Sequence, residues 1–156
     1  MTSLFETAPV MGKGPTWEEL KPGLVGRTFR RTVTEADLVN FIGVTGMVEA
    51  IFIDADYPGK AIPGRPVPAA LTQCLIEGLL FQSVIQGVGL AFLEAHVKVH
   101  GPVRVNDSIW ATLDIHEIRP TSKNNRAIVT SEVKVFNQNE ELVLSYVVKR
   151  MVAGKH

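Results

Sequence analysis

The fold of this chain is decided by residues 69–86, which read AALTQCLIEGLLFQSVIQ. Leu71, Cys74 and Leu75 begin an apolar series with helical spacing, and further apolar residues occupy the other sides. A helix that is apolar nearly all round is a buried helix. We therefore predict a long central helix over this stretch, ended by Gly87, with Cys74 as a small core residue.

The residues after this helix have the pattern of strands. Apolar residues recur at every second position in 93–99 and 109–115, and mostly so in 127–135. A period of two places one face of a strand in the core and leaves the other solvated or covered by a partner. Residues 142–148 are apolar on both faces, which predicts a central strand.

One antiparallel sheet wrapped around one long helix is the economical packing for this order of elements. The predicted class is therefore α+β, as a single hotdog domain over residues 23–153. Residues 1–22 are expected to form an N-terminal arm with a short helix near Trp17. Thr34 is predicted to cap a helix that Gly43 and Gly46 end, before an irregular stretch to about Pro68. Pairing of sheet edges across a dimer would hide them, so a homodimer or higher homo-oligomer is expected.

Composition excludes several classes of function. The 16 Lys and Arg balance the 16 Asp and Glu, so no global field attracts nucleic acid or an anionic membrane. One cysteine cannot form an intramolecular disulfide, and four scattered histidines do not indicate a zinc site. The sequence has no secretory signal and no apolar run that spans a membrane. A cytoplasmic protein that binds neither nucleic acid nor membrane is predicted.

Four segments resemble the MaoC-like acyl-CoA hydratases, in the order that this family has them. They read TEADLVNFIGVTG at 34–46, PGRPVP at 63–68, GPVRVNDSI at 101–109 and FNQNE at 136–140. The resemblance implies a hotdog dimer that binds acyl thioesters of coenzyme A. It also implies addition of water to a 2-enoyl-CoA, or its removal from a 3-hydroxyacyl-CoA, with no cofactor besides the thioester substrate.

The acid–base residues of that family have no counterpart here. The family's loop after the first helix supplies an Asp and, five residues on, a His. Counted from Thr45, the Asp position holds Met47 and the His position holds Phe52, and neither side chain exchanges a proton. A further family histidine, at the start of the long helix, is also absent.

Two carboxylates are candidate catalytic groups. Glu49 lies in the same loop, displaced by two positions from the family's Asp, and is either a substitute base or an exposed loop acid. Glu77 lies within the apolar helix, where some hotdog thioesterases place a catalytic carboxylate. Burial raises the pKa of such a carboxyl group unless it is paired. The alternative for Glu77 is therefore a structural pair with a polar group.

Substrate binding is expected at the start of the long helix. Backbone N–H groups around Pro68, Ala69 and Ala70 lie at its positive end and could hold a thioester oxygen. Arg65 precedes them, and either meets a phosphate or carboxylate or is an exposed loop residue. Three functions stay open: a hydratase or dehydratase with a non-standard active site, a catalytically silent acyl-CoA-binding or partner subunit, and an acyl-CoA thioesterase.

Overall fold

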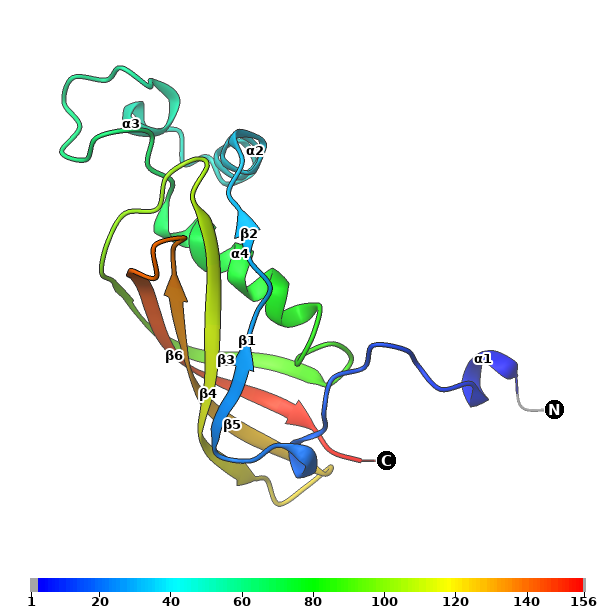
Figure 1. Cartoon of the computed structure of the whole chain (residues 1–156). Helices are drawn as coiled ribbons and strands as arrows, with labels where there is room; N and C mark the ends of the chain where they lie inside the picture. The colour runs from blue at the N-terminus through cyan, green and yellow to red at the C-terminus, as the bar shows by residue number, and fades with distance from the viewer. Residues whose placement is uncertain (1–2, 156) are drawn as a thin grey trace.

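The computed structural model of the chain describes residues 3–155, which form short helices, one long helix and one sheet (Figure 1). The elements follow in the order α1 (Leu4–Thr7), the 3-10 helix η1 (Trp17–Glu19), β1 (Gly23–Arg27), β2 (Arg31–Thr32), α2 (Glu35–Thr45), α3 (Ala50–Ile53), α4 (Ala69–Phe81), β3 (Gly89–Val99), β4 (Ser108–Pro120), β5 (Arg126–Phe136) and β6 (Leu142–Ala153).

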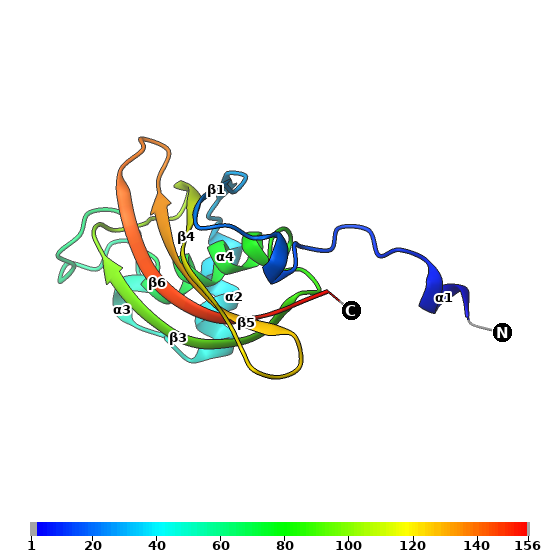
Figure 2. The ribbon, with the colours of Figure 1, turned by 90° about the horizontal axis from the view of Figure 1, so that it is seen from below.

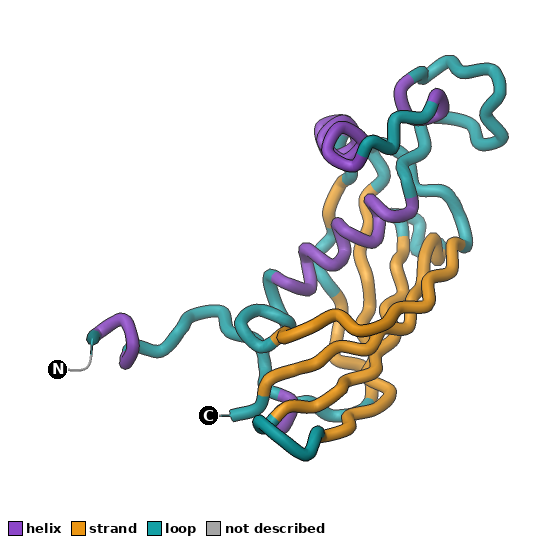
Figure 3. Tube along the Cα trace, turned by 180° about the vertical axis from the view of Figure 1, so that it is seen from behind, coloured by secondary structure: helices purple, strands orange, loops and turns teal. Residues whose placement is uncertain are grey.

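The sheet is antiparallel and curves around α4 (Figures 2 and 3). Its strand order is β1-β4-β5-β6-β3, and β2 also pairs with β4. The predicted α+β class, with an antiparallel sheet wrapped around a long central helix, is confirmed. β6 lies between β5 and β3, so the prediction of a central strand over 142–148 is also confirmed.

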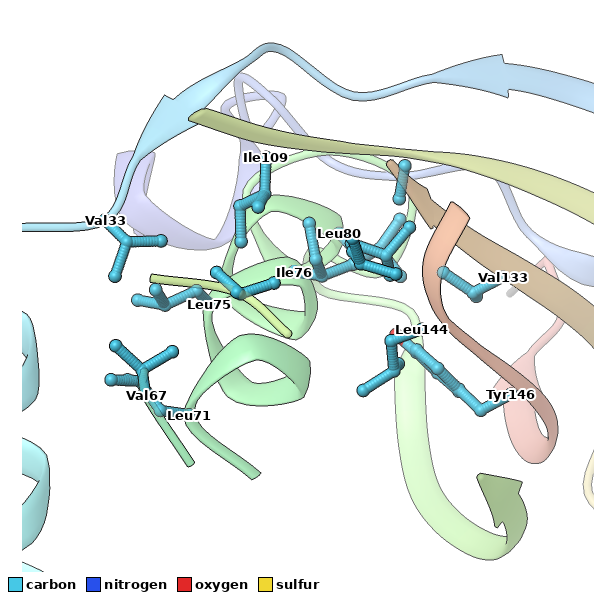
Figure 4. Close-up of a cluster of buried hydrophobic side chains, with 14 of the residues drawn as sticks. Val33, Val67, Leu71, Leu75, Ile76, Leu80, Ile109, Val133, Leu144 and Tyr146 are labelled. Carbon is cyan, nitrogen blue, oxygen red and sulfur yellow. The ribbon is translucent and has the colours of Figure 1, made fainter. Parts of the chain in front are cut away.

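The main core lies between α4 and the inner face of the sheet (Figure 4). Ile76 on α4 and Ile109 on β4 are fully buried, and Val133 on β5 and Tyr146 on β6 meet them with at most 1% of their surface exposed. The period-two pattern predicted these buried positions in β4 and β5. Burial of each such side chain contributes about 1.5–3 kcal/mol.

The central helix is shorter than the sequence predicts, because it ends at Phe81 rather than at residue 86. The Ser83 hydroxyl donates to the Leu79 carbonyl at 3.0 Å, and the Ile85 amide donates to the Leu80 carbonyl at 3.1 Å. These bonds close the last turn, and the chain then turns toward β3.

The prediction that Cys74 is a core residue is wrong, because its side chain is exposed. Phe81, also on α4, has 51% of its surface exposed. One side of the helix therefore has no cover within a single chain, and the apolar residues on it could not reveal this from their spacing.

β3 also differs from its predicted pattern. Leu93, Val97 and Val99 are 47%, 44% and 61% exposed, although the alternation predicts a buried face. The reason is that α4 packs mainly against β4 and β6, so that β3, at the end of the sheet, has little of its face covered. Among residues 3–155, no helix combines the length and the apolar character needed to span a membrane.

Candidate active site

A loop between α2 and α3 covers the start of α4, at one end of the molecule (Figure 1). α2 ends at Gly46, whose φ of 72° is a left-handed conformation that glycine adopts without a steric penalty. The Thr45 hydroxyl donates to the Phe41 carbonyl at 2.6 Å and accepts the Met47 amide at 3.3 Å. These bonds turn the chain sharply and direct the loop across α4.

The loop and the start of α4 border an open, shallow cavity of about 480 Å³, here called the loop cavity. Its lining residues are Gly46, Met47, Val48, Glu49, Phe52, Pro68, Ala69 and Ala70. The structure therefore brings the candidate base Glu49 together with the predicted backbone donors. These two groups stand far apart in the sequence, and the path of the loop joins them.

Two residues of the first turn of α4, Ala69 and Ala70, line this cavity. The Leu71 and Thr72 amides donate to the Pro68 carbonyl at 2.9 and 3.3 Å. The Ala69 and Ala70 amides stand before them, in the first turn, where a helix offers no acceptor. A pair of such donors at the positive end of a helix stabilises an oxygen that gains negative charge.

Glu49 has an exposed carboxylate at the beginning of α3. Its Oε1 accepts the Ala50 amide at 3.0 Å, which caps this short helix. No described residue donates a hydrogen bond to Oε2. The capped oxygen fixes the carboxylate in the wall of the loop cavity, and the other oxygen can accept a proton from a bound molecule.

Met47 and Phe52, which the sequence resemblance predicts at the two acid–base positions, are apolar residues in the lining of the loop cavity. Met47 is 44% exposed, and Phe52 is half-buried and packs against the main core. Phe52 also lines a second cavity of about 360 Å³, which it shares with Pro68 and Thr72. Any proton transfer in the loop cavity must therefore come from another side chain, and Glu49 is the ionisable group in its lining.

Arg65 connects α3 to the start of α2, and it is not among the residues that line the loop cavity. Its guanidinium forms an ion pair with Glu35, at the start of α2, and its Nε donates to the Phe52 carbonyl at 3.3 Å. A carboxylate does meet Arg65, but it belongs to the chain itself. Contact of Arg65 with a substrate phosphate stays a prediction.

Glu77 lies in a different place, between α4 and β6. Its Oε1 accepts the Tyr146 hydroxyl at 2.5 Å and pairs with the Arg150 guanidinium, which lies 5.5 Å from the centre of the Phe92 ring. Burial, and then the neighbouring Glu77 carboxylate, raise the pKa of Tyr146, so its hydroxyl stays protonated and donates. This geometry matches the structural alternative for Glu77.

The sequence analysis missed Tyr146 and Arg150 as the partners of Glu77. The sequence does indicate this partnership, because Tyr146 and Arg150 are four residues apart in β6 and the period of two places both on one face.

The histidines lie elsewhere: the imidazole of His96 contacts Glu94, that of His100 contacts Ser145, and that of His116 contacts Glu132. Within residues 3–155, no three His, Cys, Asp or Glu side chains gather as a metal site would require.

Comparisons with known proteins bear on this geometry. No model of a protein family matches the sequence. A 3-hydroxybutyryl-CoA dehydratase of Methylorubrum extorquens is 20% identical over 117 residues, which make up 75% of this chain and 74% of that protein. A MaoC-like dehydratase of Rhodospirillum rubrum has a TM-score of 0.79 at 23% identity, covering 92% of this chain and 99% of that one.

Two further solved structures are similar. An R-hydratase of Pseudomonas aeruginosa has a TM-score of 0.73 at 22% identity, over 90% of this chain and 86% of that one. A Mycobacterium tuberculosis protein with a double hotdog fold has a TM-score of 0.79 at 15% identity, over 91% of this chain and 45% of that one. This chain has the hotdog fold. The resemblance to MaoC-like proteins that the sequence indicates is confirmed, and the loop cavity lies where the central helix of this hotdog domain begins.

Proposed function

We propose that this hotdog protein is a MaoC-like acyl-CoA hydratase or dehydratase that acts on a 2-enoyl or 3-hydroxyacyl thioester with a non-standard active site. The observation that carries the proposal is that Glu49 lines one cavity together with Ala69 and Ala70, two residues of the first turn of α4. A carboxylate that accepts a proton and a pair of donors for the thioester oxygen are the groups that this reaction requires.

The proposed hydration uses one carboxylate for both proton transfers. Glu49 takes a proton from water as the water oxygen bonds to C3 of the enoyl chain. The electron pair of the C2–C3 double bond moves toward the thioester oxygen, which accepts hydrogen bonds from the Ala69 and Ala70 amides. The proton on Glu49 then passes to C2 and the thioester carbonyl re-forms. One water is added in total, and the reverse sequence is dehydration.

The test follows mass change of acyl-CoA substrates. The purified chain is incubated with a panel of 2-enoyl- and 3-hydroxyacyl-CoA thioesters, and gain or loss of one water is measured by mass spectrometry. Glu49→Gln keeps the size of the side chain and removes the base, so turnover should fall by about 10²–10⁴-fold. Glu117→Gln, an exposed acid on β4, is the matched control. Full activity in Glu49→Gln would exclude this role.

A second candidate function is a catalytically silent subunit that binds acyl-CoA or pairs with an active homologue. The apolar Met47 and Phe52 in the cavity wall favour it, because they replace both family acid–base residues. This function predicts binding of an acyl-CoA without any water-shifted product in the same assay.

A thioesterase that uses Glu77 has less support, since Tyr146 and Arg150 already engage Oε1 of this carboxylate. Release of free coenzyme A by the unaltered chain, lost in a Glu77→Gln variant whose circular dichroism shows that it is still folded, would favour it.

We also propose that two copies pair through β3. This strand has a free edge and exposed apolar side chains, including Val97 and Val99. The exposed side of α4, with Cys74 and Phe81, is a further apolar surface that has no cover within one chain. Pairing of the two β3 edges would satisfy their backbone groups and continue the sheet from one copy into the other.

A further inference from the structure

The edge of the sheet at β1, opposite to the β3 edge, carries a groove that has no role in the proposed hydration. Its cavity is about 560 Å³ and its lining residues are Arg27, Phe29, Arg30, Trp110 and Glu140. The volume lies within the range of small-molecule sites, about 300–1,000 Å³. We call it the edge groove.

An irregularity of the edge strand creates this groove. Arg27 at the end of β1 pairs with Thr112, and Arg31 at the start of β2 pairs with Ile109. Between them the Thr28 amide donates to the Ala111 carbonyl at 2.8 Å. Residues 29 and 30 are therefore both opposite residue 110, as in a β-bulge. Bulges re-aim side chains and occur often beside functional sites.

Trp110 is held firmly in the wall of the groove. Its neighbours Ile109 and Ala111 are fully buried against the core, so the period of two directs Trp110 to the other face of the sheet. The indole stacks on Phe136 with 4.8 Å between ring centres, and its Nε1 donates to the Asn137 carbonyl at 3.2 Å. An occupant therefore meets a fixed aromatic surface.

The arginines of the groove are exposed, and within residues 3–155 their one side-chain hydrogen bond runs from Arg27 Nη1 to the Thr28 carbonyl at 3.2 Å. Arg27 and Arg30 form no ion pair there, whereas the nearby Arg31 pairs with Asp37 at 2.7 Å. Phe29 has 85% of its surface exposed, although it stands between these two arginines. Glu140, on the turn between β5 and β6, supplies a single carboxylate to the opposite wall. Neither the core nor the sheet needs this combination.

We propose that the edge groove binds a nucleoside phosphate. Phosphate oxygens would meet the guanidinium groups of Arg27 and Arg30, which match them as bidentate donors. The base would stack on the aromatic surface of Phe29 and Trp110. The Glu140 carboxylate would accept hydrogen bonds from ribose hydroxyls or from an amino group of the base. The nucleotide end of an acyl-CoA and a free nucleotide share this chemistry, and the first source alone rests on the proposed function.

The test uses the fluorescence of Trp110. The chain has two tryptophans, so Trp17→Phe leaves Trp110 as the reporter. Titration with adenosine 3′,5′-bisphosphate should change its emission saturably. Loss of each guanidinium, in Arg27→Gln or Arg30→Gln, should weaken binding about tenfold. Glu140→Ala should weaken binding, because it removes the carboxylate that accepts hydrogen bonds from the ribose or the base. Arg119→Gln, outside the groove, is the matched control and should leave affinity unchanged.

Calorimetry on the unaltered chain repeats the titration without any tryptophan change. Competition then separates the two sources: displacement of the bisphosphate by coenzyme A assigns the groove to the thioester substrate. Displacement by ADP but not by coenzyme A assigns it to a free nucleotide. The proposal is overturned if the bisphosphate does not bind, or if it binds equally to Arg27→Gln, Arg30→Gln and the control. The titration measures binding and not turnover. Its result therefore stands even if the protein shows no activity in the hydration assay.

Discussion

Glu77 on α4 accepts the hydroxyl hydrogen of Tyr146 on β6 at 2.5 Å, and the same carboxylate oxygen pairs with Arg150. The helix and the sheet are thus joined by a charged contact as well as by apolar packing. The side chains of Arg150 and Glu77 are only 8% and 15% exposed, so each charge depends on the other for its solvation. Removal of either partner leaves the other charge buried without a counter-charge.

Glu77→Gln should therefore destabilise the fold strongly. The Arg150 guanidinium would stay buried without a counter-charge, and a broken buried pair costs about 3–5 kcal/mol. Tyr146→Phe removes only the hydroxyl and keeps the ion pair, so it should cost about 1–2 kcal/mol. Urea unfolding followed by circular dichroism measures both. Equal losses in the two variants would show that the ion pair contributes little.

Introduction of the acid–base pair that the sequence resemblance implies should raise the proposed hydratase activity. Met47→Asp combined with Phe52→His places the missing groups in the wall of the loop cavity, and general acid–base catalysis contributes about 10²–10⁴-fold. The rate of water addition to a short 2-enoyl-CoA is the measurement. Met47→Asn combined with Phe52→Gln is the matched control, with similar polarity and no titratable group. A rise in this control as large as in the acid–base variant would contradict the explanation.

Val97→Lys should convert the proposed dimer into a monomer. A lysine on the free edge of β3 places a charge where the second copy would pack, and edge strands use lysine to prevent pairing. Light scattering after size-exclusion chromatography gives the mass of each species. Lys123→Glu, in the turn between β4 and β5, should leave the mass unchanged. An unaltered chain that elutes as a monomer would rule out the β3 interface.

Asp37 should make the start of α2 sensitive to acid. Burial alone would raise the pKa of Asp37, but hydrogen bonds from Thr34 and the charge of Arg31 outweigh it and lower that pKa. A carboxyl group with a lowered pKa stabilises the fold above its unfolded pKa of about 3.9, and this contribution is lost as the pH falls through the folded value.

Asp37→Asn should then cost about 1 kcal/mol at pH 7, as loss of a helix cap does, and less at pH 3. The free energy of unfolding in urea at the two pH values gives the difference. Asp56→Asn, an exposed loop acid, is the control for general effects of charge. A cost for Asp37→Asn that is the same at both pH values would contradict a role for the ionised carboxylate.

Much of the sheet could be predicted from the sequence, because alternation records which face of a strand is buried. Leu113 and Val133 follow this rule and are at most 9% exposed. The rule fails at β3, since apolar residues there indicate burial without saying whether the cover is intramolecular. Cys74 was misassigned for the same reason.

The candidate site was predictable only in part. Glu49 and Ala69 were identified separately, and a tertiary path that no local pattern encodes brings them to one cavity. The edge groove was not predictable at all. Its formation depends on which residues of β1, β2 and β4 stand opposite one another, and composition carries no record of that pairing.

The bulge at residues 29 and 30 makes the groove separable from the rest of the domain. Ile109 and Ala111, on either side of Trp110, are fully buried on the opposite face of the sheet. Deletion of Phe29 would let the edge strand run straight and would close the groove, while the core stays intact. At this edge, the presence of one residue decides whether the groove forms, so loss of a single codon would remove the proposed binding surface and keep the domain.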